Sequence, residues 1–313
     1  TEMGSPIWKG FTPGNDARVV HNIRLSNGLI IGKTDTAEFA VSSLGKSLNP
    51  YDPLRTPGSS SSGSSTAVSS CMVPLALGTQ TAGSIIRPAS YSGVYGFKPS
   101  FGLIPRTGML KTTDSLDQIG FFARHPKDLD LFFDVIRVKG ENYPISNKIL
   151  DNPKKSNNLK RKWKIGFTKT PVWENAEDYS KIFFENFINK LKKKNQFEVE
   201  ELILPKEFDL VHKMHEIIYT KSLSYYFKNE LKKKTLISKI FYEFASQAEK
   251  IDLTKFNLAL NYQSKISQIL DRQFHNFDIN FSLSTSGQAP FRNDEQKNDP
   301  SLIWTMCGVP TIN

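Results

Sequence analysis

The 313-residue sequence has few cysteines and histidines, and it has no long apolar run. Its two cysteines, Cys71 and Cys307, lie among apolar residues, which predicts buried, reduced thiols and a cytoplasmic location. No cysteine and histidine spacing indicates a zinc site, so we expect neither a metal nor another cofactor. No apolar stretch reaches the roughly 18 residues of a membrane span, and no signal-peptide pattern occurs. We therefore expect no membrane association.

Charge of one sign is in excess, because the formal net charge is +10. The excess lies mainly in lysine-rich runs at 152–164, 192–194 and 232–234. These lysines are not interleaved with arginines or exposed aromatics, and two of the runs flank predicted helices. A solvated surface is favoured over a polyanion-binding face, so nucleic acid is not an expected partner.

The first part of the chain, residues 1–138, is rich in small residues and has short apolar runs, which predicts helices alternating with strands. With 38% hydrophobic residues there is ample material for a core. Helix followed by strand is typical of an α/β fold. Helices are expected at 15–28, 65–71 and 126–138, and strands at 29–34, 75–79 and 93–99.

The second part, residues 163–313, follows a polar linker at 139–162. We predict that the two parts form one domain, in which the helical stretch after residue 206 covers the rest. The pattern predicts strands at 163–168, 197–204 and 277–284, helices at 177–194 and within 206–275, and a short helix around Trp304.

Two serine-bearing stretches stand out, "TPGSSSSGSSTAV" (56–68) and "GTQTAGSIIRP" (78–88). The first resembles a flexible linker but runs directly into a helix of small residues, so its serines are anchored at a helix start with free backbone N–H groups. In the second, Ser84 ends a turn after a predicted buried strand, where small residues permit close backbone contact. That setting suits a nucleophile beside an oxyanion hole, or a loop that merely packs a helix start.

A serine–histidine–aspartate triad has no support, since no histidine lies near either stretch in sequence. His212, His215 and Glu216 share a turn of a predicted helix, but their order does not fit a zinc helix, and we expect a solvated helix face there. Asp117 is expected to be structural.

The two stretches, in their order and spacing, resemble the amidase signature family. The resemblance is carried by "PGSSSSGSS", "STAVSSCMVPLALGTQTAGSIIRPAS" and "GVYGFKPSFGLIPRTGML". It is strong over 1–138, weak to about residue 275, and returns in "LSTSGQAPF" and "LIWTMCGVPTI". The resemblance implies an α/β fold with a mixed β-sheet sandwiched between helices, and a Ser–cis-Ser–Lys amide hydrolase.

By position, the resemblance assigns the nucleophile to Ser84 and the bridging serine, behind a cis peptide bond, to Ser60. We expect the Ser60 and Ser84 hydroxyls within hydrogen-bond reach, on the floor of a cleft roofed by the helices after residue 206. Arg87 and Ser61 are candidate substrate contacts, and Arg87 could instead brace the loop. The resemblance gives the oxyanion hole to the backbone N–H groups of Thr81, Ala82, Gly83 and Ser84.

The family's catalytic lysine has no counterpart in these 313 residues, because its strand would precede the matched segment. Both ends are therefore interpreted as cuts, and this fragment is expected to be inactive alone. Lys33 is a weak alternative base. Ser59, Ser62 and Gln80 also depart from the family's usual residues, although Gln-Thr-Ala-Gly-Ser is a familiar variant.

Three functions follow from the resemblance. The first is an amidase that hydrolyses a carboxylic amide C–N bond of a small molecule through a serine acyl-enzyme. The second is the amidase subunit of a tRNA-dependent glutamine amidotransferase. The third is a catalytically inactive amidase-like protein. A homodimer is compatible with each of them.

Overall fold

The computed structural model describes the chain over residues 1–41, 43–140, 150, 161–294 and 296–313. Most of the expected linker at 139–162 therefore lies outside the described residues. Within them, no helix is both long and apolar enough to cross a membrane.

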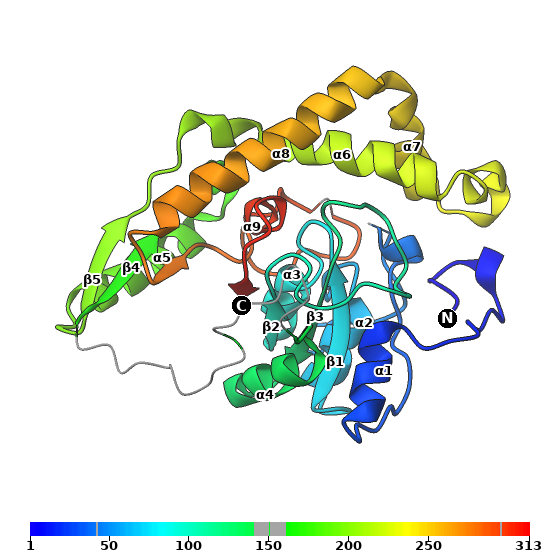
Figure 1. Ribbon diagram of the computed structural model, residues 1–313, viewed down its shortest axis with the longest axis horizontal. Helices are drawn as coiled ribbons and strands as arrows, with labels where there is room; N and C mark the ends of the chain where they lie inside the picture. The colour runs from blue at the N-terminus through cyan, green and yellow to red at the C-terminus, as the bar shows by residue number, and fades with distance from the viewer. Residues whose placement is uncertain (42, 141–149, 151–160, 295) are drawn as a thin grey trace.

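Helices and strands alternate along the chain, as the sequence predicts (Figure 1). The α-helices are α1 (Arg18–Leu25), α2 (Ser62–Ser69), α3 (Ile86–Ser92), α4 (Pro126–Ile136), α5 (Asp178–Lys192), α6 (Val211–Tyr226), α7 (Lys239–Ser246), α8 (Leu253–Phe274) and α9 (Leu302–Met306). The strands are β1 (Leu75–Gln80), β2 (Tyr95–Lys98), β3 (Gln118–Ala123), β4 (Trp163–Phe167), β5 (Phe197–Glu201), β6 (Ile279–Phe281) and β7 (Thr311–Ile312).

The first sheet is antiparallel, with the strand order β1-β3-β2-β7. All six residues of β3 are buried, and β3 pairs with both β1 and β2. Gly120 in β3 permits this packing, because a Cβ atom there would lie 2.1 Å from the Phe97 carbonyl oxygen. Strand β7 places the end of the chain beside β2, so segments far apart in sequence share this sheet.

The second sheet is parallel, with the order β5-β4-β6. Helix α5 connects β4 to β5 and packs through Phe184 and Ile188 against apolar side chains of this sheet. A helical crossover is what two neighbouring parallel strands require. The α/β class of sheets with flanking helices is thus confirmed, although the described strands form two sheets and not the single sheet that we expected.

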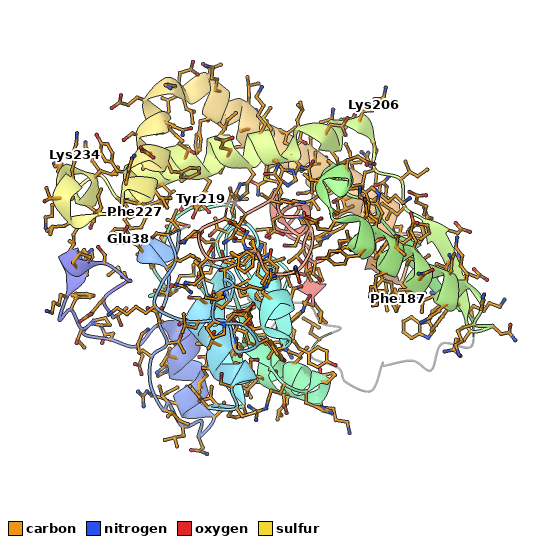
Figure 2. The ribbon with its side chains drawn as sticks, turned by 180° about the vertical axis from the view of Figure 1, so that it is seen from behind. Glu38, Phe187, Lys206, Tyr219, Phe227 and Lys234 are labelled. Carbon is orange, nitrogen blue, oxygen red and sulfur yellow. The ribbon has the colours of Figure 1, made fainter. Side chains whose placement is uncertain are left out.

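Helices α6, α7 and α8 form a layer across the first sheet (Figure 1). Leu116, near β3, shares one apolar cluster with Ile218 of α6 and Ile266 of α8. Figure 2 shows Tyr219 and Phe227 of α6 on the side that faces the first part of the chain, where both pack with residues around Phe39. The cover predicted after residue 206 is therefore present and shares its core with the serine-bearing part.

Two sequence expectations are wrong. Residues 29–34 form no strand, because this segment pairs with no other strand in the described part of the chain, and Leu29 and Ile31 are 85% and 70% exposed. Cys71 is exposed, since it follows the end of α2 in a turn with positive φ, whereas Cys307 is buried as expected.

Candidate active site

The serine run lies in the loop that leads into α2. Its peptide bond between Ser59 and Ser60 is cis, as the resemblance predicts. The Ser59 carbonyl accepts a hydrogen bond of 2.9 Å from the Arg87 guanidinium, and the Ser60 carbonyl accepts one of 3.1 Å from the backbone N–H of Ala37. The loop is therefore held on both sides of this bond, and it is an anchored segment, not a free linker.

Ser84 lies in the turn between β1 and α3, where the sequence places it. The Gln80 side chain at the end of β1 accepts hydrogen bonds from the backbone N–H groups of Ile85, at 2.7 Å, and Ile86, at 3.0 Å. Free N–H groups at a helix start need such a partner when they are buried. Gln80 thus satisfies the residues just after Ser84 and leaves those just before it unpaired.

The peptide groups before Ser84 are held through their carbonyl oxygens. The Thr81 carbonyl accepts from His215 Nε2 at 2.9 Å, and the Ala82 carbonyl accepts from Thr305 Oγ1 at 2.7 Å. The Gly83 carbonyl accepts from the backbone N–H of Arg87 at 2.9 Å. In a trans peptide the carbonyl and the following N–H point in opposite directions.

Three N–H groups, those of Ala82, Gly83 and Ser84, therefore point away from these partners. Within the described part of the chain, they and the Thr81 N–H donate no hydrogen bond. Unpaired, preorganised N–H donors beside a serine are what an oxyanion hole requires.

Asp117 supports this turn from below. One carboxylate oxygen accepts a hydrogen bond of 2.7 Å from Thr81 Oγ1, and the other accepts from the backbone N–H groups of Thr112 and Thr113, at 2.7 and 2.9 Å. The carboxylate is buried, so its charge is balanced by hydrogen bonds. This is the structural role that the sequence predicts for Asp117.

Access to the serines is narrow, because Ser84 is 9% exposed and Ser60 is 1% exposed. Two surface pockets, of about 630 and 400 Å³, are lined by neither serine. Helix α6 contacts the Ser84 turn directly where we expected an open cleft. Among the described residues no hydrogen bond joins the Ser60 and Ser84 hydroxyls, although we expected them within reach of one another.

The two candidate substrate contacts have protein partners. Arg87 forms an ion pair of 3.2 Å with Asp299 and also binds the Ser59 carbonyl, so it braces the serine loop. The Ser61 hydroxyl bonds to the backbone N–H and carbonyl of Thr79, each at 3.2 Å, and so fastens the loop to β1.

A proton acceptor for the serines is not among the bonded lysines of the described chain. Lys33 is exposed and has no bonded partner there. Burial lowers the pKa of Lys98 in β2 to about 7, which suits a base, but its ammonium group donates to the Gln118 side chain and to the Pro99 and Val309 carbonyls. Neither lysine bonds to a serine of the site. No group of side chains that could hold a metal occurs among the described residues.

The sequence analysis missed four residues that shape the turn, and it placed one of them wrongly. His215 is not on a solvated helix face: it is 5% exposed, because α6 packs directly on the turn. Its spacing of three from His212 was the available signal, since both point the same way. Thr305 is polar within an otherwise apolar helix, and Asp299 precedes that helix. Gln80 was noted only as a departure.

Comparisons with known proteins agree with this geometry. The model of a family described as Amidase matches residues 1–304. A protein of Sulfolobus acidocaldarius, named as a subunit of glutamyl-tRNA(Gln) amidotransferase, is 43% identical over 142 residues, which are 44% of this chain and 30% of that protein. A protein of the same name from Clostridium botulinum is 30% identical over 356 residues, covering 99% of this chain and 72% of the relative.

The solved structure of the glutamyl-tRNA(Gln) amidotransferase protein of this name from Thermotoga maritima superposes with a TM-score of 0.82 at 26% identity. The match covers all of this chain and 72% of that one. The chain thus spans less than a third of the first relative in its alignment and about 70% of the others.

Proposed function

Because the chain belongs to the amidase family, we propose that it hydrolyses a carboxylic amide C–N bond through an acyl-enzyme on Ser84. The observation that carries the proposal is the turn before Ser84, where three carbonyls are tied back and the N–H groups that follow them are free. This arrangement supports stabilising the oxyanion that forms when a serine attacks an amide carbonyl.

In the proposed first step, Ser84 Oγ attacks the amide carbon, and the carbonyl oxygen becomes an oxyanion that binds the N–H groups of Ala82, Gly83 and Ser84. The hydroxyl proton of Ser84 passes through Ser60 to a base, and returns to the leaving nitrogen as the C–N bond breaks. Water then attacks the acyl-enzyme, gives up a proton along the same path, and releases the carboxylic acid and Ser84.

The base is the remaining requirement of this scheme. The family resemblance gives it to a lysine that the 313 residues do not contain, and Ser60 can relay a proton but cannot store it. A serine hydroxyl without a base is a weak nucleophile at neutral pH. We therefore expect these residues alone to hydrolyse amides slowly, with a residual rate from the oxyanion donors.

The test is turnover of a simple aryl amide by the chain, alone and lengthened by a lysine-bearing family strand before Thr1. We expect the longer chain to be faster, its Ser84→Ala and Ser60→Ala variants to lose that gain, and Ser70→Ala, at an exposed serine, to keep it. Equal rates for the longer chain and its Ser84→Ala variant would refute the proposal. No turnover by any chain would favour an inactive amidase-like protein.

A second candidate is the release of ammonia from glutamine for a partner protein. It is favoured by the relatives, which are named as a subunit of glutamyl-tRNA(Gln) amidotransferase. The lengthened chain should then hydrolyse glutamine in preference to aryl amides, and faster when the other subunits of such an enzyme are added. A preference for aryl amides that the subunits do not change would favour a stand-alone amidase.

A further inference from the structure

Helix α6 reaches the turn before Ser84 with an imidazole. His215 Nε2 lies 2.9 Å from the Thr81 carbonyl oxygen, and one turn earlier His212 Nε2 lies 3.1 Å from the carbonyl oxygen of Asp299. A carbonyl oxygen can only accept, so in both rings Nε2 carries the proton. The helix that covers the site therefore donates a hydrogen bond to the loop that holds the nucleophile.

We propose that His215 is a positioning residue for the oxyanion hole, and that it acts by fixing the peptide plane between Thr81 and Ala82. Its hydrogen bond to the Thr81 carbonyl directs the Ala82 N–H away from α6 and toward the place of the substrate oxygen. This inference rests on the proposed amide hydrolysis and adds to it a residue from the part of the chain where the family resemblance is weak.

The surroundings of His215 suit a neutral donor. The ring is buried, and burial lowers its pKa to about 4, so the imidazole is neutral at physiological pH. The charged or titratable groups that face it are His212 of its own helix, Asp299 of the loop before α9, and Tyr219, whose ring centre lies 5.6 Å away. A neutral ring can hold the Thr81 carbonyl without adding a positive charge beside the oxyanion.

Only the direction of the peptide group depends on the Nε2 proton. The Thr81 side chain is already fixed by Asp117 on the other side of the backbone. A side chain of similar size without a donor would still fill the space under α6, but it would leave a buried carbonyl unpaired and free to turn. Packing and positioning can therefore be separated by substitution.

The activity test compares His215→Phe, which keeps a ring and loses the donor, with His215→Gln, whose amide nitrogen can take the place of Nε2. His21→Phe, at an exposed histidine of α1, is the control. In the lengthened, active chain we expect His215→Phe to lower kcat by about tenfold to a hundredfold with KM nearly unchanged. His215→Gln should recover most of the loss, and His21→Phe should have no effect. Equal kcat values for all four proteins, or an equal loss for Phe and Gln, would overturn the inference.

A second measurement does not need activity. In the ¹⁵N-labelled 313-residue chain, the His215 ring should be protonated at Nε2 only, and His215→Phe should shift the Ala82 amide resonance while His215→Gln leaves it near its original place. A His215 ring protonated at Nδ1, or an Ala82 resonance unchanged by His215→Phe, would overturn the inference. A lengthened wild-type chain that gives these signals but has no turnover would instead contradict the proposed function alone.

Discussion

The turn before Ser84 and helix α6 above it satisfy their polar backbone groups in opposite ways. In α6 the N–H and carbonyl groups bond within the helix, and the side chains carry the contacts outward. In the turn, carbonyls bond to groups from other elements while the N–H groups stay free. A regular element therefore serves as the support, and an irregular one keeps donors available for a ligand.

The same contrast separates the two parts of the chain. Residues 1–138 contain both serines, but His215, Asp299 and Thr305, which hold the backbone around them, lie beyond residue 163. The family pattern is strong in the first part and weak in much of the second. The part with the recognisable motif thus depends for its geometry on the part without one.

The comparison should break most severely at Asp117, which holds the turn from within the first part. Asp117→Ala would leave at least four buried donors without an acceptor, and we expect a loss of about 3–5 kcal/mol in the free energy of unfolding. Urea denaturation would measure it. Asp130→Ala, at an exposed aspartate of α4, is the control, and an equally small change in both variants would show that Asp117 does not support the turn.

A smaller effect is expected where the second part presses on the turn. A Cβ atom at Gly83 would lie 1.6 Å from Asp299 Oδ2, so Gly83→Ala must displace the carboxylate that pairs with Arg87. We expect a loss of about 1–3 kcal/mol, measured by the same unfolding experiment. Gly14→Ala, where nothing lies within 4 Å of the new atom, should be nearly neutral. A neutral Gly83→Ala would mean that Asp299 does not confine the turn.

The smallest effect is a pH dependence at Lys98, which joins β2 to the Val309 carbonyl near the chain end. Its pKa is about 7 in the folded chain against 10.5 for a free lysine, because burial disfavours the charged form, and the neighbouring Cys307 offsets this only in part. Between these two values the unfolded chain binds the proton and the folded chain does not. The free energy of unfolding should therefore rise with pH over this window, by up to about 1.4 kcal/mol per pH unit.

Thermal or urea unfolding between pH 7 and 10 would detect this slope. Lys98→Met should flatten it, while Lys213→Met, at an exposed lysine of α6, should leave it unchanged. If the slope survives in Lys98→Met, the buried ammonium group is not its source.

Local patterns predicted well where local chemistry decides the structure. The apolar run "LALGT" became β1, and the spacing of Leu129 and Ile136 gave α4 its buried face. The turn position of Ser84 and the cis bond before Ser60 followed from the family pattern. These features depend mainly on residues that are close in sequence.

Other features depend on partners that are distant in sequence, and the sequence could not supply them. Residues 29–34 have the composition of a strand but find no partner to pair with in the described part of the chain. His215 lies 134 residues from the carbonyl it holds, and Thr305 lies 223 residues from its own. Only tertiary packing brings such groups together, so the oxyanion donors were predicted while the side chains that aim them were not.

The most direct test of the central claim is covalent. The 313-residue chain would be mixed with an activated aryl ester, which needs less help from a base than an amide, and the modified peptide would be identified by mass spectrometry. The account predicts one acyl group on Ser84, lost in Ser84→Ala and unchanged in Ser70→Ala. An acyl group on another serine, or equal labelling of wild type and Ser84→Ala, would contradict the assignment of Ser84 as the nucleophile.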